Sequence, residues 1–218
     1  MHGNVTFEQA LNLSCNVAFA QIAIELGQEK LNEAFSSLGF DVSHTTSDRM
    51  TTSKGIFNVS EETSSADIGW AGIGQHTTLV NPYSFLTYMC AIANGGTCYE
   101  PHFVKSAVTE NGRTVYSAEL TDSGLNINPS TASTLKKIMR STVSDYYGDY
   151  RFGNLTMCGK TGTAERDDSL PNAWFVGFSA DEAFPYAIVV VMEESGSGLK
   201  YAGTAASNVL QELYNKSN

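Results

Sequence analysis

The chain has 218 residues, of which 42% are apolar and 11% aromatic, which is enough for one sizeable hydrophobic core. Its net charge of −10 argues against nucleic acid and against anionic lipid surfaces as partners. No apolar run reaches the length of a membrane span, and the cysteines and histidines follow no metal-ligand spacing, so neither a metal nor another cofactor is expected. Among the four cysteines, Cys90 and Cys98 are the only two close enough in sequence to be tested as a pair.

The first part of the chain is predicted to be mostly helical. Capping residues and apolar periodicity predict helices at residues 6–13, 17–26, 28–38, 64–70 and 81–93. The second of these is apolar on nearly all sides, which predicts a buried helix, and Gly27 is expected to end it. Residues 41–60 are rich in Ser and Thr and lack a sustained period, which predicts an extended surface arm.

The second part of the chain is predicted to contain the main sheet. Alternation and an Asn-Gly turn predict a hairpin of residues 104–108 and 113–117, and a helix at 129–143 and a loop at 144–154 follow. Three strands near 155–165, 173–178 and 186–192 and a helix at 203–214 complete the prediction. This order indicates an α/β fold of the α+β type, with an antiparallel β-sheet flanked by helices, and suggests a mostly helical part at 1–150 and a sheet part at 151–218.

The segment Met157–Glu165 carries the residues most suited to chemistry. Gly162 lets a ligand or another backbone approach the strand closely, while Lys160, Thr161 and Thr163 supply a positive charge, hydroxyls and backbone N–H groups. Such an edge suits a carboxylate or an oxyanion. Taken alone, however, a Lys-Thr-Gly tripeptide is more often an ordinary strand with a solvated lysine.

A second short motif, Ser14-Cys15-Asn16, is weak by itself, because the same residues could simply cap a helix. Together with Lys160-Thr161-Gly162 it matches the second and third elements of the serine active-site set of β-lactamases and penicillin-binding proteins. Further stretches agree with this set and follow the same order: Val5–Phe19, Gly72–Gln75, Asn81-Pro82, Ala93–Gly96, Gly159–Glu165 and Ala173–Gly177. Most of the chain therefore resembles the transpeptidase domain of class B penicillin-binding proteins.

The resemblance implies acyl transfer on the D-Ala-D-Ala ends of peptidoglycan stem peptides, through a serine acyl-enzyme that β-lactams also form. By motif position, Ser14 would relay a proton and Asn16 would hold the substrate amide. Lys160 would supply positive potential, Thr161 and Thr163 would offer hydroxyls to the substrate carboxylate, and the Thr163 N–H would be one oxyanion-hole donor, typically worth about 3 kcal/mol in the transition state. Gly162 would keep this edge open.

One departure bears on activity. The family's nucleophile lies in a Ser-x-x-Lys element several tens of residues before Ser-x-Asn, and none of the thirteen residues before Ser14 is a serine. Ser133-Thr134-Leu135-Lys136 has the pattern, but it lies between the other two elements on a predicted amphipathic helix, so a coincidental match is expected. The segment Ser144–Gly148 also replaces the Gly-Thr turn expected before the Lys-Thr-Gly strand. We therefore expect a partial domain that is inactive alone because it lacks the N-terminal strands and the nucleophile helix.

Three interpretations remain open at this point. The favoured one is part of a D,D-transpeptidase of cell-wall synthesis whose longer parent carries the activity. The others are a β-lactam sensor or binding module, and a degenerate interaction domain of the same superfamily. The resemblance also implies an extracytoplasmic location and an N-terminal membrane anchor on the parent, and the residues before Met1 would distinguish an enzyme from a degenerate domain.

The strand Tyr186–Met192 suggests a further property. It is apolar, β-branched and free of charge and proline, which is typical of an interior strand. In the family this strand neighbours another strand that precedes the nucleophile helix. We therefore expect its edge to be covered, either by a second copy of the chain or by the segment before Thr6.

Overall fold

The computed structural model describes residues 2–46 and 50–217, and the statements below concern these residues. Regular helices form at α1 (Phe7–Asn12), α2 (Asn16–Ser37), α3 (Ser65–Gly72), α4 (Pro82–Ala93), α5 (Pro129–Ser141) and α6 (Thr204–Ser217). Two π-helical segments, η1 (Thr142–Tyr147) and η3 (Leu199–Gly203), and the 3₁₀-helix η2 (Asp149–Phe152) continue or precede them. The strands are β1 (Thr97–Tyr99), β2 (Ser106–Val108), β3 (Thr114–Ser117), β4 (Asp122–Asn126), β5 (Met157–Ala164), β6 (Asn172–Ser179) and β7 (Ala187–Met192).

The main sheet is the antiparallel meander that the sequence predicts, in the order β5-β6-β7. Its register is unbroken along β5, with Lys160 opposite Val176 and Thr161 opposite Phe175. Two facing glycines permit this close pairing, since a Cβ on Gly177 would lie 2.4 Å from the Cys158 carbonyl oxygen and a Cβ on Gly159 would lie 2.6 Å from the Phe175 ring. Strand β6 is the central strand of the three.

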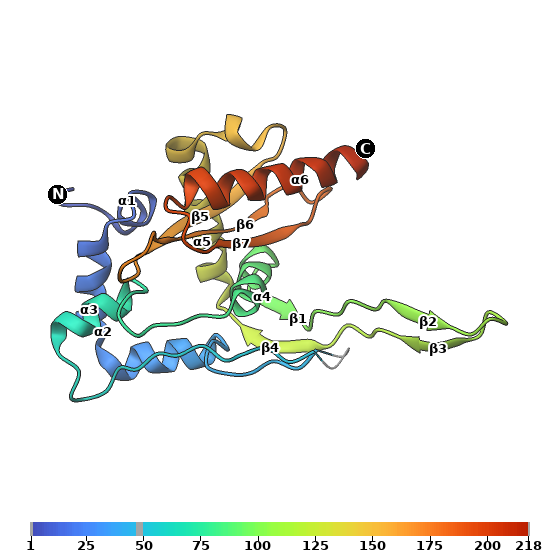
Figure 1. Cartoon of the computed structure of the whole chain (residues 1–218), viewed down its shortest axis with the longest axis horizontal. Helices are drawn as coiled ribbons and strands as arrows, with labels where there is room; N and C mark the ends of the chain where they lie inside the picture. The colour runs from blue at the N-terminus through green and yellow to red at the C-terminus, as the bar shows by residue number, and fades with distance from the viewer. Residues whose placement is uncertain (1, 47–49, 218) are drawn as a thin grey trace.

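The sheet is covered on both faces, with α6 on one and α4 on the other (Figure 1). Because side chains alternate along a strand, Met157 and Phe175 face a core cluster with α6, whereas Cys158 and Val176 face a cluster with α4. All four side chains are at least nine-tenths buried. Because of this alternation, successive side chains of β5 also contact different elements outside the core.

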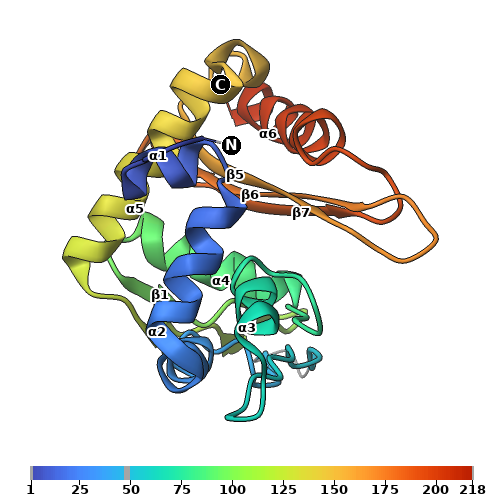
Figure 2. The same cartoon turned by 90° about the vertical axis from the view of Figure 1, so that its left-hand side faces the viewer.

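The helices α1 to α3 lie beside this core (Figure 2). Thr6 and Gln9 form the predicted capping box of α1, and the course of α2 breaks at Gly27 (φ 78), where the sequence predicts a stop. The prediction that residues 17–26 form a buried helix is wrong. Val17 and Ile24 are 63% and 42% exposed, because this part of α2 packs on α3 along one side and leaves the other open.

The predicted surface arm at 41–60 is irregular, with residues 47–49 outside the described part, and it touches the body through the bridge between Ile56 and Leu79. The predicted hairpin is present as β2 and β3, and it projects from the body (Figure 1). At the base of this hairpin, β1 and β4 form a two-stranded ribbon that pairs Thr97 with Asn126. This ribbon was not among the elements predicted from the sequence.

The predicted loop at 144–154 is wrong, because this segment is helical. After α5 the chain continues without a break into η1 and then, past Gly148 (φ 91), into η2. Arg140 of α5 binds both carboxylate oxygens of Asp149 and the carbonyl oxygen of Met157. These contacts fix the helical segment against the first residue of β5.

The segment before Thr6 does not cover β7, which corrects one of the two expectations for that edge. His2, Gly3, Asn4 and Val5 instead lie against the start of α2. No helix within the described residues has the length and apolarity needed to cross a membrane. The described residues also contain no group of three or more His, Cys, Asp or Glu side chains placed to hold a metal ion.

Candidate functional site

The two sequence motifs meet although 146 residues separate them, because Lys160 Nζ donates a hydrogen bond to Ser14 Oγ. Ser14 has a φ of 50°, a conformation uncommon for a residue with a side chain, and it ends α1 in the way that a C-terminal left-handed residue does. The next residue, Cys15, is buried and donates its N–H to the Ala10 carbonyl oxygen at 2.8 Å. This anchored turn leaves the Ser14 side chain exposed to solvent and to Lys160.

The turn that presents Ser14 is held in place by contacts with α5 and η1. The buried Asn12 accepts a hydrogen bond from Thr142 Oγ1 at 2.6 Å and donates one to Ser141 Oγ at 3.1 Å. The buried amide of Asn12, bonded through both its oxygen and its nitrogen, fixes the orientation of the turn. Breaking either hydrogen bond would leave a polar group without water or a partner. The position of Ser14 therefore depends on α5.

Thr161 is held by Tyr147, the last residue of η1. The Thr161 N–H donates to Tyr147 Oη at 3.0 Å, and the two hydroxyl oxygens lie 2.9 Å apart. Since that N–H is bonded to Tyr147, it points away from β6. Residues two apart in a strand point their N–H groups to the same side, so the Thr163 N–H also lies on the free edge of β5.

Thr163 contacts the connection that follows β7. Its hydroxyl oxygen accepts a hydrogen bond from the Gly198 N–H at 3.2 Å. Gly198 packs so closely that a Cβ would lie 2.3 Å from the Gly162 carbonyl oxygen. The free edge of β5 thus presents one exposed threonine, its backbone N–H and a cation, which together suit an anionic or carbonyl oxygen.

A cavity of about 350 Å³ opens along this strand and contains the predicted residues Lys160, Thr161, Gly162 and Thr163. Its opposite wall comes from residues 73–75 and 78–80 and from the Phe85 ring of α4, while Trp174 of β6 forms the floor. Phe85 and Trp174 pack together with their ring centroids 5.9 Å apart. The cavity therefore combines an apolar wall with one polar strand edge, as small-molecule sites commonly do.

Asn16 lies apart from this cavity. It is the first residue of α2, its side chain is exposed, and it lines a second cavity of about 780 Å³ together with Ser14 and the segment 2–5. Because Ser14 lines one cavity and Lys160 the other, the two spaces adjoin at the hydrogen bond between them. The structure therefore brings Ser14 to Lys160, with Asn16 two residues further along the chain at the start of α2.

The chain contains two Ser-x-x-Lys sequences, and neither one has a Ser–Lys side-chain hydrogen bond among the described residues. Ser133 is exposed on α5, and Lys136 lines a cavity beside Cys90 and Phe178. The second, Ser197–Lys200, was not considered in the sequence analysis and begins beside the Lys-Thr-Gly strand. Ser197 Oγ accepts from the Lys200 N–H at 3.4 Å, and Lys200 Nζ lies over the Tyr201 ring, so this serine bonds to the backbone of the first turn of η3 and not to the lysine side chain.

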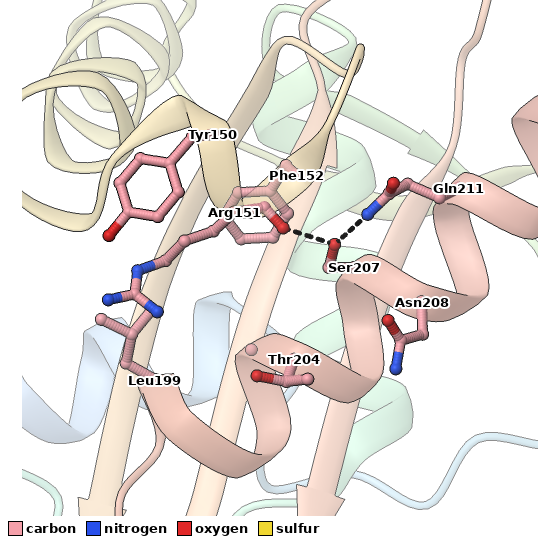
Figure 3. A pocket seen from close by; sticks show the side chains of 9 residues that line it. Tyr150, Arg151, Phe152, Leu199, Thr204, Ser207, Asn208 and Gln211 are labelled. Atoms are coloured by element: carbon pink, nitrogen blue, oxygen red, sulfur yellow. Dashed lines mark hydrogen bonds between the residues drawn. The ribbon is translucent and has the colours of Figure 1, made fainter.

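A third cavity, of about 250 Å³, lies between η2 and α6 and contains none of the predicted site residues (Figure 3). Its central polar groups bond to one another, with Ser207 Oγ donating to the Arg151 carbonyl oxygen at 2.6 Å and Gln211 Nε2 donating to Ser207 Oγ (Figure 3). Since these groups satisfy each other, their role is to tie α6 to η2.

Sequence reasoning missed two residues that shape the site, Tyr147 and Gly198. Tyr147 fell in a segment predicted to be a loop, and Gly198 in a connection without periodicity. Neither position carries a local pattern that points to β5, since both contacts depend on how the chain returns to the strand. The motif residues could be found only because their spacing matches a known set.

Comparison with known proteins identifies the family of the chain. The family model "Penicillin binding protein transpeptidase domain" matches residues 1–215. The chain is 25% identical over 211 residues to the peptidoglycan D,D-transpeptidase PbpA of Mycolicibacterium smegmatis, covering 92% of this chain and 41% of that protein. It is also 25% identical over 220 residues to stage V sporulation protein D of Bacillus subtilis, covering 97% of this chain and 34% of that protein. The chain thus spans well under half the length of these relatives.

Solved structures give the same answer for the fold. A D,D-transpeptidase domain from Eggerthella lenta superposes with a TM-score of 0.86 at 25% identity, covering 98% of this chain and 54% of that one. Penicillin-binding protein A of Mycobacterium tuberculosis, solved as a ceftriaxone acyl-enzyme complex, superposes with a TM-score of 0.82 at 23% identity, covering 95% and 48%. The predicted class B resemblance and β-lactamase-like fold are therefore confirmed, and the chain belongs to the penicillin-binding protein transpeptidase domain family.

Proposed function

We propose that this chain forms the Ser-x-Asn and Lys-Thr-Gly walls of a D,D-transpeptidase site that acts on the D-Ala-D-Ala ends of peptidoglycan stem peptides. The observation that carries the proposal is the hydrogen bond between Lys160 and Ser14, which joins the two motifs at the mouth of a cavity. The acyl-enzyme reported for the M. tuberculosis relative supports β-lactams as ligands of the same site. The active unit is the longer parent protein.

Each motif residue has a role that its position supports. Lys160 places a positive charge beside Ser14 Oγ, which favours the hydroxyl as a proton relay to the leaving nitrogen. The N–H of Thr163, on the free edge of β5, is the oxyanion donor, and the hydroxyls of Thr161 and Thr163 receive the substrate carboxylate. Gly162 keeps the strand accessible, and Asn16 holds the substrate amide.

The attacking serine comes from a Ser-x-x-Lys element outside these 218 residues. The cavity of about 780 Å³ beside Ser14 and Asn16 is the space next to both motifs in which such an element would sit. Without it, Ser14 remains a weakly nucleophilic alcohol, because its hydrogen-bond partner Lys160 acts as a donor to it and not as a base. The chain alone is therefore inactive, and a β-lactam sensor whose acylated serine also lies outside these residues stays the alternative.

Labelled penicillin tests this directly. The chain alone should show no covalent adduct by intact-protein mass spectrometry at neutral pH, whereas the parent protein should be acylated at its Ser-x-x-Lys serine. A stoichiometric mass increase on the chain, mapped to Ser133, Ser197 or any other serine, would refute the assignment. An unreactive parent would instead favour a degenerate interaction domain.

The roles of Lys160 and Ser14 separate in a binding experiment. In the parent protein, Lys160→Ala should abolish binding of a D-Ala-D-Ala peptide, because it removes the charge at the strand edge, whereas Ser14→Ala should leave binding nearly unchanged and lower the acylation rate. Equal losses of binding in both variants would mean that the relay is wrongly assigned to Ser14.

The same proposal includes location and assembly. Peptidoglycan stem peptides are the substrate, so we propose an extracytoplasmic parent held at the cell membrane by an anchor outside this chain. The chain's net charge does not favour nucleic acid. For the isolated chain we propose self-association through β7 (Tyr186–Met192 in the sequence), whose outer edge is unpaired in the three-stranded sheet.

A further inference from the structure

The cysteines Cys90 and Cys98 come together at the base of the projecting ribbon. Cys90 lies in the last turn of α4, and Cys98 is the inward-facing middle residue of β1, only 3% exposed. The two thiols are within hydrogen-bonding reach of each other, and both belong to one cluster with Ala91 and Leu125. All four cysteines are free thiols in the structure, and Cys158 lies in a different cluster, between α4 and the sheet.

The turn between them holds this approach in place. The N–H of Gly96 donates to the Ala91 carbonyl oxygen at 2.8 Å, and its own carbonyl accepts from the Ile127 N–H at 2.7 Å. Gly96 has a φ of 121°, and a Cβ there would lie 2.2 Å from the Ile127 carbonyl oxygen. Because a glycine at this position lets β1 fold back onto α4, the proximity of the thiols is built into the backbone.

We propose that Cys90 and Cys98 form an intramolecular disulfide when the protein meets a disulfide oxidant. Cys90 also lines a cavity of about 330 Å³ between α4 and β7, so this sulfur is the one that an oxidant can reach. The bond would tie the base of the projecting ribbon to α4, the helix whose Phe85 lines the Lys160 cavity.

The exchange proceeds in two steps. With Cys98 as the thiolate, its own proton having gone to solvent, Cys90 Sγ attacks one sulfur of the oxidant disulfide and passes its proton to Cys98. The S–S bond breaks, and the first leaving thiolate takes up a proton from solvent. Cys98 Sγ then attacks Cys90 Sγ, releases the second thiolate, and its proton goes to that leaving group. The protein dithiol is oxidised by two electrons, and the oxidant is reduced to two thiols.

The electrostatic surroundings agree with this order. The hydrogen bond from Cys90, with a further one from Ser123, lowers the pKa of Cys98 against the effect of burial. The hydrogen bond to Cys98 and burial raise the pKa of Cys90, which therefore keeps the proton within the pair. Cys98 is thus prepared to accept that proton and then to attack.

The sequence makes the experiment unambiguous. Between Lys54 and Lys105 there is no lysine or arginine, so trypsin leaves Cys90 and Cys98 in one peptide, while Cys15 and Cys158 fall in two others. The purified chain is incubated with oxidised glutathione or with dithiothreitol, denatured, alkylated with N-ethylmaleimide and digested. After oxidation, the peptide Gly55–Lys105 should carry no alkyl group and should lack two hydrogen atoms, while Cys15 and Cys158 are alkylated.

Variants provide the controls. Cys158→Ala and Cys15→Ala should still form the link, whereas Cys90→Ser and Cys98→Ser should not. The melting temperature of the oxidised wild type should fall on reduction, and that of the double variant Cys90→Ser/Cys98→Ser should not change with redox state. Four alkylated cysteines after oxidation, or a link between any other two peptides, would overturn the proposal. Because no readout involves acyl transfer, the result is independent of the proposed function.

Discussion

Replacing Tyr147 by phenylalanine should destabilise the fold, because its hydroxyl holds Thr161 from outside the sheet. The variant removes the acceptor for the Thr161 N–H at 3.0 Å and the contact to the Thr161 hydroxyl at 2.9 Å, and it keeps the ring that packs against the α6-side core. Each partly buried hydrogen bond contributes about 0.5–1.5 kcal/mol net, so the loss should be about 1–3 kcal/mol.

Urea unfolding measures this loss as a lower midpoint at an unchanged slope. The matched control is Tyr150→Phe, since Tyr150 is 78% exposed and only three residues away, and this change should stay within about 0.5 kcal/mol of wild type. Equal midpoints for the two variants would refute the argument that Tyr147 fixes the Lys-Thr-Gly strand. In the parent protein, Tyr147→Phe should also slow acylation by β-lactams, because Thr161 would lose its fixed orientation.

Other parts of the structure give further predictions. Gly198→Ala should cost about 1–3 kcal/mol, since its Cβ would lie 2.3 Å from the Gly162 carbonyl oxygen. Gly203→Ala, whose Cβ would have a Leu199 methyl at 3.3 Å as its nearest neighbour, should cost less in the same urea assay. Burial raises the pKa of Cys158 from 9.0 to about 11, so the folded state favours the thiol over the thiolate. The contribution of this thiol to the free energy of unfolding is complete below pH 9.0. It is lost as the pH rises toward about 11. Between about pH 9 and pH 11 the unfolding free energy should therefore fall less steeply in Cys158→Ala than in wild type, and parallel curves would contradict this. Ala187→Pro should weaken self-association in sedimentation experiments. The Tyr186 carbonyl oxygen accepts from the Ser179 N–H of β6, so the N–H of the next residue, Ala187, faces the free edge of β7; an unchanged dimer would place the contact elsewhere.

The structure also changes how the β7 edge should be tested. Lysine at Val189 or Val190 is the obvious substitution from sequence, but Val189 packs on the α4-side cluster and Val190 on the α6-side cluster. A lysine at either position would damage the core of the monomer as well as any interface. The free edge of β7 is formed by its backbone groups, so a proline at the small residue Ala187, which removes one N–H group, is the sharper test.

Local patterns predicted the elements whose cause is local. Thr6 and Gln9 cap α1, Asn81 caps α4 ahead of Pro82, and Gly27 breaks α2, because capping and glycine conformations depend on neighbouring residues. The prediction that residues 17–26 are buried was wrong for the opposite reason. An apolar composition allows burial, but whether a partner covers Val17 or Ile24 depends on elements far away in the sequence.

The candidate site divides in the same way. Ser14 and Lys160 could be found because each belongs to a short motif with known spacing, and the resemblance placed them in one site. Tyr147 could not, because its contact to Thr161 requires that η1 be helical and lie against β5. The ordinary loop composition of residues 144–154 hides this, since a π-helical continuation of α5 depends on the packing of Arg140 and Asp149.

The contacts of α5 and η1 explain how two motifs 146 residues apart meet in a fixed geometry. Ser141 and Thr142 bind the buried Asn12 and so position the turn that presents Ser14. Arg140, the residue before Ser141, binds the carbonyl of Met157. Tyr147, five residues after Thr142, binds Thr161, and these two contacts position the strand that presents Lys160. Both halves of the site therefore rest on the same stretch, residues 140–147, and a disturbance there should change the relation of Ser14 to Lys160 even though neither residue is touched.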